Sequence, residues 1–164
     1  MGVLKVKNNF LSKEIFSKIK KEFFEHFNFP WYYLKHQVSK KDKPFFSHCF
    51  FQEEKINSPF YYKIINPIID KLSAKKIYLI RANLLLKNEK SLISAFHTDL
   101  SFKCKTAIYY VNSNNGGTLF KTNKEEIEIK SEENKIVMFD SQILHAAKSQ
   151  TDTDTRIVIN INYE

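Results

Sequence analysis

The strongest constraint on the fold is a series of short strand-like segments in the second half of the chain. From Lys75 onward, β-branched and aromatic runs alternate with turns such as NSNNGG and TDTDT. Eight such runs can be distinguished: KKIYLIRANLLLK, SLISAFHTD, KTAIYYVN, GTLFK, IEIK, KIVMFD, ILHAAK and TRIVININY. Closely spaced strands of this kind predict an antiparallel sandwich or barrel. We therefore expect a jelly roll over residues 75–164.

The N-terminal part has a helical pattern instead. Ser12 can cap a helix that ends at about Phe27, because apolar residues recur every four positions, at Ile15, Ile19, Phe23 and Phe27. A second helical segment is expected over Pro59–Leu72, where Pro67 should kink the helix or split it in two. Residues 28–58, which are aromatic and lysine-rich, are expected to form loops and short strands.

The length of 164 residues fits one domain with a substantial core. Helices followed by many strands predict helices packed outside a sheet. We expect a mainly β fold, a double-layered jelly-roll core buttressed by α-helices. Residues 1–74 would form its helical and aromatic N-terminal part, and residues 75–164 its jelly-roll core. The N-terminus has no apolar segment typical of a secretory signal, and no apolar run approaches the ~20 residues that cross a bilayer. A soluble, cytoplasmic protein without a membrane partner is expected.

The net charge of +8 raises the question of a nucleic-acid partner. Residues 1–50 contain 10 lysines against 4 acidic residues, so the positive charge is concentrated there. However, only Arg81 and Arg156 are arginines, whereas dedicated readers of phosphates and bases usually employ the bidentate arginine fork. This composition disfavours a nucleic-acid partner without excluding one.

The apolar stretch LISAFHTDLSF contains a histidine and an aspartate two residues apart. On a strand, alternate side chains share a face, so His97 and Asp99 would point the same way. A buried carboxylate is costly unless it is paired or bound. His145 ends the strand-like KIVMFDSQILH in the same half of the chain. Two histidines and one carboxylate match the facial triad that binds Fe(II), and the lack of thiolate ligands disfavours structural zinc.

His48, next to Cys49, could belong to a metal pair or a Cys–His nucleophile. No second Cys or His follows at ligand spacing, so a structural histidine is favoured there.

Arg156 lies eleven positions after His145, in TRIVININY. On a strand it would share one face with Val158, Asn160 and Asn162. An inward-facing guanidinium needs an anionic partner. The sequence leaves two partners open, namely the carboxylate of a bound co-substrate and an internal acid such as Asp140.

Together these motifs resemble the Fe(II)/2-oxoglutarate-dependent oxygenases, and in particular their prolyl-hydroxylase-like branch. The spacing is His97-Thr98-Asp99, 45 residues, His145, ten residues and Arg156. KTAIYYVNSNNGGTLF resembles the TxxYYLN-type strand and Gly-Gly turn of that branch, and KIVMFDSQILHAAKS resembles its strand, turn and distal histidine. The resemblance covers roughly Ile77–Tyr163, and the first 75 residues show no matching motif.

The resemblance implies a double-stranded β-helix in which His97, Asp99 and His145 bind Fe(II). It implies that Arg156 binds the distal carboxylate of 2-oxoglutarate, and that O₂ is the second co-substrate. The activity implied is a dioxygenase that hydroxylates its substrate and releases succinate and CO₂.

The resemblance also implies roles for three further residues around the co-substrate. Tyr110 is the second tyrosine of the YY pair, which in this branch hydrogen-bonds the distal carboxylate. Thr106 shares the strand face of Tyr110 and could line the pocket. Asn83 could contact the co-substrate or the pocket, or could simply be a hydrogen-bonded asparagine at a strand edge.

Two departures from the family pattern narrow the substrate. Collagen-type prolyl hydroxylases have lysine where this chain has Arg156, and alkylated-base demethylases usually have a second arginine where it has Asn162. A peptide or protein side chain is the first expectation for the substrate, and a free amino acid or other small metabolite is the second. Two other classes remain open. One is a metal-dependent, cupin-like isomerase or hydrolase, which would have no use for Arg156, and the other is a non-catalytic jelly-roll binding module.

Overall fold

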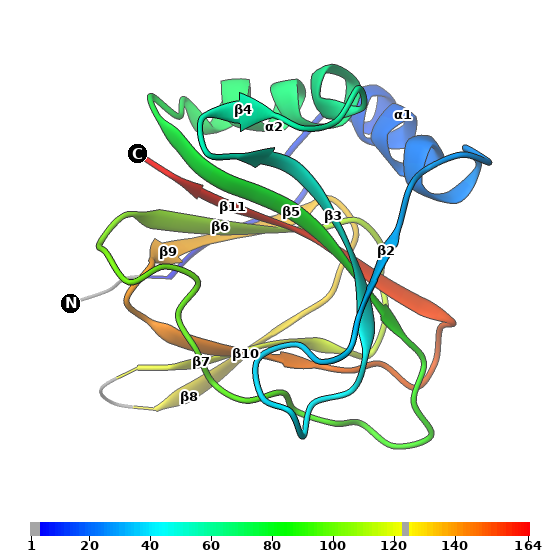
Figure 1. The fold of residues 1–164 in the computed structure, drawn as a ribbon, viewed down its shortest axis with the longest axis vertical. Helices are drawn as coiled ribbons and strands as arrows, with labels where there is room; N and C mark the ends of the chain where they lie inside the picture. Colours follow the sequence, from blue (N-terminus) through cyan, green and yellow to red (C-terminus); the bar gives the residue numbers. More distant parts are fainter. Residues whose placement is uncertain (1–3, 123–124) are drawn as a thin grey trace.

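The computed structural model describes residues 4–122 and 125–164, which form two antiparallel sheets facing each other (Figure 1). The larger sheet has the order β1 (Lys5–Lys7), β9 (Lys135–Asp140), β6 (Lys105–Tyr110), β11 (Thr155–Tyr163), β5 (Ile77–Leu86), β3 (Phe45–Gln52) and β2 (Tyr32–Leu34), with β4 (Lys55–Ile56) beside β3. The smaller sheet contains β10 (Leu144–Lys148), β7 (Gly117–Lys121) and β8 (Glu126–Lys130). The predicted mainly β jelly roll with N-terminal helices is confirmed.

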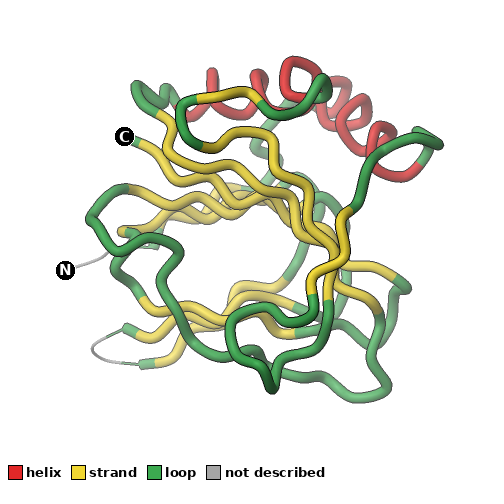
Figure 2. Tube along the Cα trace, in the orientation of Figure 1, coloured by secondary structure: helices red, strands yellow, loops and turns green. Residues whose placement is uncertain are grey.

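Strand alternation gives the larger sheet two different faces. On one face, isoleucines of β11 join the helices in the main apolar core: Ile157, Ile159 and Ile161. Figure 2 shows the helical segments together on this side of the sheet. On the other face, the intervening residues of β11 line a cavity between the sheets: Arg156, Val158, Asn160 and Asn162.

The first helix, α1, spans Lys13–Phe24, and Ser12 caps it by accepting a hydrogen bond from the Ile15 amide (3.3 Å). It ends three residues before the predicted Phe27, whose side chain is 99 % exposed. The predicted apolar stripe also included Phe16 and Phe24. Its buried members are Phe16, Ile19 and Phe23, whereas Ile15 and Phe24 are exposed. The chain leaves the helix so that Phe29 enters the core, where its ring packs at a tilt of 54° against the indole of Trp31 (4.9 Å between ring centroids).

The second helical segment is split as predicted. A π-helical turn over Tyr61–Ile65 is followed by α2 over Asn66–Leu72. Pro67 lies in the first turn of α2, where its missing N–H costs no hydrogen bond. No helix of the described residues is long and apolar enough to cross a lipid bilayer.

The structure corrects two expectations about strands. Residues 28–58 contain β3, an eight-residue strand paired with β5, so the N-terminal part supplies strands of the larger sheet as well as helices. Conversely, SLISAFHTD is not a continuous strand, and makes only two isolated bridges, Ile93 with Lys148 and His97 with His145. Serine hydroxyls replace part of the ladder there, because Ser94 Oγ accepts from the Ala147 amide (3.0 Å).

Candidate metal centre

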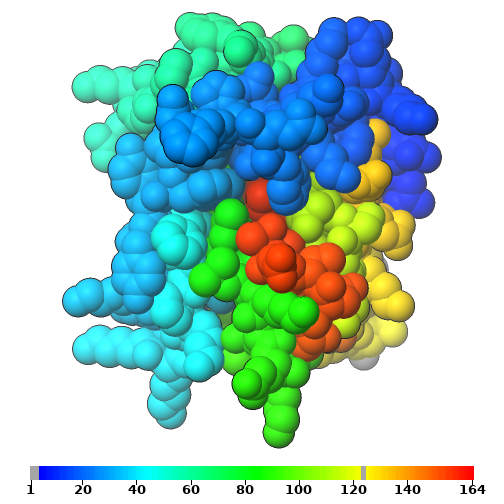
Figure 3. Space-filling view, turned by 90° about the vertical axis from the view of Figure 1, so that its right-hand side faces the viewer, coloured from blue at the N-terminus to red at the C-terminus, as the bar shows by residue number. Residues whose placement is uncertain are grey.

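A cavity of about 300 Å³ lies between the two sheets. Its walls come from the polar faces of β5 and β11, from residues 97–99, from β10 and from the segment that contains β2. One side of this region is visible in Figure 3, where the cyan chain around residue 40 adjoins the green chain around residue 90. Asp42 links these two segments, because its Oδ1 accepts a hydrogen bond from the Ala95 amide (3.1 Å).

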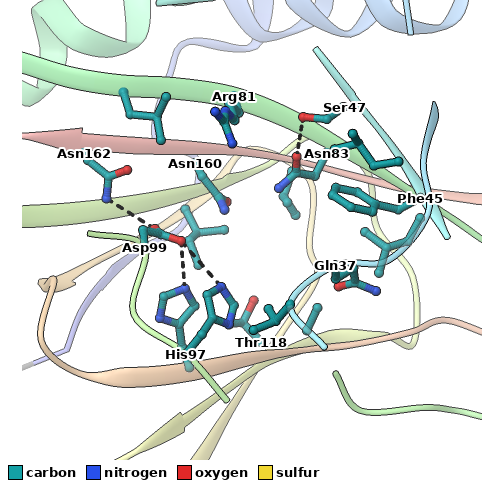
Figure 4. A pocket seen from close by; sticks show the side chains of 18 of the residues that line it. Gln37, Phe45, Ser47, Arg81, Asn83, His97, Asp99, Thr118, Asn160 and Asn162 are labelled. Atoms are coloured by element: carbon teal, nitrogen blue, oxygen red, sulfur yellow. Dashed lines mark hydrogen bonds and ion pairs between the residues drawn. The ribbon is translucent and has the colours of Figure 1, made fainter. Parts of the chain in front are cut away.

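His97, Asp99 and His145 form a cluster at the cavity wall (Figure 4). The isolated bridge joins His97 and His145 through two backbone hydrogen bonds of 3.0 Å, which brings their rings to 4.5 Å between centroids. Asp99 Oδ1 lies 3.6 Å from Nε2 of each histidine. One ligand atom from each of the three residues lies within 4.8 Å of the others.

The second nitrogen of each imidazole orients its ring. Nδ1 of His97 lies 3.2 Å from the Ala95 carbonyl, and Nδ1 of His145 lies 3.2 Å from the Ile143 carbonyl. Each Nδ1–H can therefore donate to the backbone, which leaves the Nε2 lone pairs for a metal. Nε2 of His145 is buried and has no hydrogen-bond partner within residues 4–122 and 125–164. This orphaned nitrogen beside a carboxylate fits a divalent metal ion.

The electrostatics of the cluster also favour a bound cation. Burial alone would raise the pKa of Asp99, but His145 and His97 outweigh it and hold that pKa well below its usual value. Burial would lower the pKa of His97, whereas Asp99 raises it, and the net pKa of His97 is raised. Asn162 Nδ2 also donates to Asp99 Oδ2 (3.3 Å), so the carboxylate is ionised and held in place.

Arg156 lines the same cavity and is only 1 % exposed. Its Nε donates to Ser131 Oγ (2.8 Å), and its Nη2 donates to the Gly117 carbonyl (2.8 Å) and to Thr118 Oγ1 (3.2 Å). All of these acceptors are neutral, and in the described part of the chain Arg156 has no acidic partner. Asp140, the internal partner considered from the sequence, lies near Lys103 instead (3.6 Å).

The Gly-Gly turn lets the backbone approach Arg156 closely. A Cβ on Gly116 would lie 3.1 Å from Arg156 Cδ and 2.7 Å from the Lys148 carbonyl oxygen. A Cβ on Gly117 would meet the Ile129 carbonyl oxygen at 2.7 Å. The NSNNGG motif thus shapes the pocket of the guanidinium.

No family model and no curated protein sequence matches the chain. Several solved structures do. A prolyl hydroxylase from Trichoplax adhaerens, in complex with a hypoxia inducible factor peptide fragment, aligns with a TM-score of 0.73 at 13 % identity, covering 98 % of this chain and 82 % of that one. A 2OG-Fe(II) oxygenase family protein from Burkholderia pseudomallei gives 0.72 at 8 % identity, covering 99 % and 84 %. A Pseudomonas putida prolyl-4-hydroxylase gives 0.63 at 10 % identity, covering 98 % and 92 %.

The chain has the fold of the 2-oxoglutarate/Fe(II) oxygenases. This confirms, at the level of the fold, the resemblance that the motifs indicated, and prolyl hydroxylases are among the solved structures that share this fold.

Within this oxygenase fold, Tyr110 lies behind Arg156. Its ring centroid is 5.9 Å from Arg156 Cζ, and its hydroxyl donates to Thr118 Oγ1 (2.9 Å). Burial raises the pKa of Tyr110 to about 12, although Arg156 and Thr118 oppose this rise. Tyr110 is therefore a neutral hydrogen-bonding group beside the guanidinium, and does not neutralise it.

Thr106 and Asn83 occupy different environments. Thr106 is fully buried and accepts a hydrogen bond from Asn162 Nδ2 (2.9 Å), so Asn162 takes the expected place of Thr106 on the cavity wall. Asn83 does line the cavity, and its Oδ1 accepts from Ser47 Oγ (2.9 Å).

The sequence arguments missed the groups that hold Arg156 and Asp99. Ser131 and Thr118 come from distant segments and have no local signal. The position of Asn162 in the cavity was predictable, because Asn162 shares a strand face with Arg156.

Proposed function

We propose that the protein is an Fe(II)- and 2-oxoglutarate-dependent dioxygenase that hydroxylates an organic substrate with release of succinate and CO₂. One observation carries this proposal. A single cavity contains both a two-histidine, one-carboxylate cluster and a buried arginine. Among the described residues, one imidazole nitrogen of the cluster has no hydrogen-bond partner and the arginine has no acidic partner. The first feature suits Fe(II), and the second suits the far carboxylate of a dicarboxylic acid.

In this proposal, His97, Asp99 and His145 would hold the iron through two imidazole nitrogens and one carboxylate oxygen. When bound, the iron supplies activation of O₂ and the oxidising power for hydroxylation. Arg156 binds the distal carboxylate through charge-assisted hydrogen bonds. Tyr110 remains uncharged and packs beside the guanidinium of Arg156. The walls of the cavity limit the access of water to the reacting groups.

The alternatives explain fewer of these observations. A cupin-like isomerase or hydrolase would use the metal cluster but leaves Arg156 without a role, and a binding module leaves both unexplained. For the substrate, the peptide complex of the similar prolyl hydroxylase supports a peptide or protein side chain. A small metabolite is the second candidate for the substrate.

The test is the visible absorption of the anaerobic protein with Fe(II) and 2-oxoglutarate. Chelation of the iron by the keto acid gives a weak charge-transfer band, which we expect in the wild type and in the exposed-surface control Lys90→Gln. The band should be absent in Asp99→Ala and reduced or lost in Arg156→Ala. Wild-type protein that binds the metal yet shows no band would refute the dioxygenase and put the isomerase or hydrolase first.

A further inference from the structure

Arg81, the second of the two arginines, has no role in the proposed chemistry, yet it lines the same cavity. It lies on β5 directly opposite Asn160 of β11, and is partly exposed. Its Nη2 donates to Gln52 Oε1 (2.8 Å), which fixes the guanidinium and uses one of its five donors. Across residues 4–122 and 125–164 it forms no ion pair with an acid.

The residue opposite Arg81 has an unused acceptor. Asn160 Oδ1 is buried and has no hydrogen-bond partner among the described residues, and Asn160 lines the cavity. Figure 4 shows Asn160 between Arg81 and the metal cluster, with Asn83 on the other side. The cavity wall therefore offers guanidinium donors beside an unpaired amide oxygen.

The charges around the cavity leave one positive charge unbalanced. Its lining residues with a fixed charge are Arg81, Asp99 and Arg156. Asp99 balances one arginine, and the dication and the dianionic co-substrate of the proposed function would balance each other. The remaining positive charge calls for one further anionic group.

Arg81 and Arg156 reach different parts of the cavity. Arg156 lies on β11 four residues from Asn160, the partner of Arg81, which corresponds to roughly 13 Å along the sheet. The distal carboxylate of a five-carbon diacid held by Arg156 therefore does not reach Arg81. A cavity of about 300 Å³ is also at the small end for ligand sites, so the part of the substrate that enters is small.

We propose that the substrate carries a carboxylate that binds Arg81, with an adjacent N–H group that donates to Asn160 Oδ1. A carboxylate next to a nitrogen is the signature of an α-amino acid, either free or as the C-terminal residue of a peptide. This inference rests on the proposed function, and it names the substrate class of that site.

The experiment measures binding by calorimetry to protein loaded anaerobically with Fe(II) and 2-oxoglutarate. The probes are the L-amino acids, their N-acetyl derivatives as mimics of a peptide C-terminus, and the α-carboxamide of each. At least one acid should bind, and its carboxamide should bind about 10- to 100-fold more weakly, as expected for loss of a charge-assisted pair. Arg81→Gln should weaken the acid to the level of the carboxamide. Arg81→Lys should lie between them, and the control Lys90→Gln should match the wild type.

The affinity for 2-oxoglutarate, measured on the same variants through the charge-transfer band, should change less than about twofold in Arg81→Gln. Preference for the free acid or for its N-acetyl form identifies the source of the carboxylate. Binding of no acid, equal binding of acids and carboxamides, or loss of 2-oxoglutarate affinity in Arg81→Gln would each overturn the inference. Acid binding that depends on Arg81, in protein without a charge-transfer band, would support the subsite and refute the dioxygenase instead.

Discussion

His48 and His145 are equally buried, each 3 % exposed, but their ring nitrogens have opposite environments. Nδ1 of His48 lies 2.8 Å from the Pro30 carbonyl, and its Nε2 lies 2.7 Å from Ser58 Oγ, so both nitrogens are satisfied. In His145 only Nδ1 is satisfied, and Nε2 faces a carboxylate at 3.6 Å. Burial alone therefore does not separate a structural histidine from a candidate ligand, whereas the hydrogen bonds of the ring do.

The two histidines also lie on different sides of the sandwich. His48 is on the helix side of β3, with the rings of Phe29 and Phe50 at 4.7 and 4.6 Å between centroids. Ser47, one residue earlier, lines the cavity. Because neighbouring residues of a strand face opposite sides of the sheet, His48 packs in the core while Ser47 can contact a ligand in the cavity.

The largest expected effect is on the cavity side. In His145→Ala the candidate metal site loses one of its three ligands, so metal-dependent succinate formation should fall more than about 100-fold, beyond the 10- to 100-fold typical of losing an outer-shell partner. The stabilisation that excess Fe(II) gives the wild type, about 2.7 kcal/mol at a hundredfold excess over Kd, should disappear. Thermal unfolding with and without the metal measures this. If Fe(II) still stabilised the variant, His145 would not be a metal ligand, and it would not differ in this respect from His48.

The helix side should behave in the opposite way. His48→Ala removes two hydrogen bonds, leaves the buried Ser58 hydroxyl with the Phe60 amide as its remaining partner, and opens a cavity between aromatic rings. We expect a loss of about 2–4 kcal/mol in the free energy of unfolding, measured with urea. Fe(II) affinity should stay within about twofold of the wild type. The exposed His26→Ala is the matched control, and it should cost less than about 1 kcal/mol.

The contrast also shows what the sequence could reveal. The grouping of His97, Asp99 and His145 could be predicted from their spacing, although an isolated bridge from His97 to His145, and not a continuous strand, brings them together. Arg156 was placed correctly by the alternation of β11, which turns it into the same cavity. The bond from Arg156 to Ser131 was not predictable, because it depends on the register of distant segments. The buried residues of α1 belong to the predicted stripe, but the helix ends before Phe27, and Phe29 enters the core in place of Phe27. Short strands were predicted within residues 28–58, but the eight-residue length of β3 and its place in the larger sheet were not, because its pairing with β5 is non-local.

A smaller effect is expected for the guanidinium at the far end of the cavity. In Arg156→Lys the charge is kept, but the fork that meets a carboxylate with two hydrogen bonds is lost. The affinity for 2-oxoglutarate should fall about tenfold, measured through the charge-transfer band, and the Fe(II) affinity should not change. An equal loss of both would mean that Arg156 supports the metal cluster rather than the co-substrate.

The smallest expected effect is the pH dependence that the buried His48 gives to the free energy of unfolding. Burial lowers the pKa of His48, and the hydrogen bond to Pro30 offsets only part of this. The unfolded chain, with an ordinary histidine pKa near 6.5, then binds more protons than the folded chain below about pH 6.5. His48 therefore contributes its full stability above that pH, and the contribution is lost as the pH falls toward the pKa of the folded state.

We expect the free energy of unfolding of the wild type to decrease between pH 7 and 5 by up to about 1.4 kcal/mol per pH unit more than that of His48→Gln. Both proteins are unfolded with urea in the presence of a chelator, so that metal binding to the cavity does not contribute. The raised pKa of His97 acts in the opposite direction, but it acts in both proteins and cancels in the difference. Parallel pH profiles for the two proteins would show that the burial of His48 carries no cost in protonation, and that its difference from His145 lies in hydrogen bonding alone.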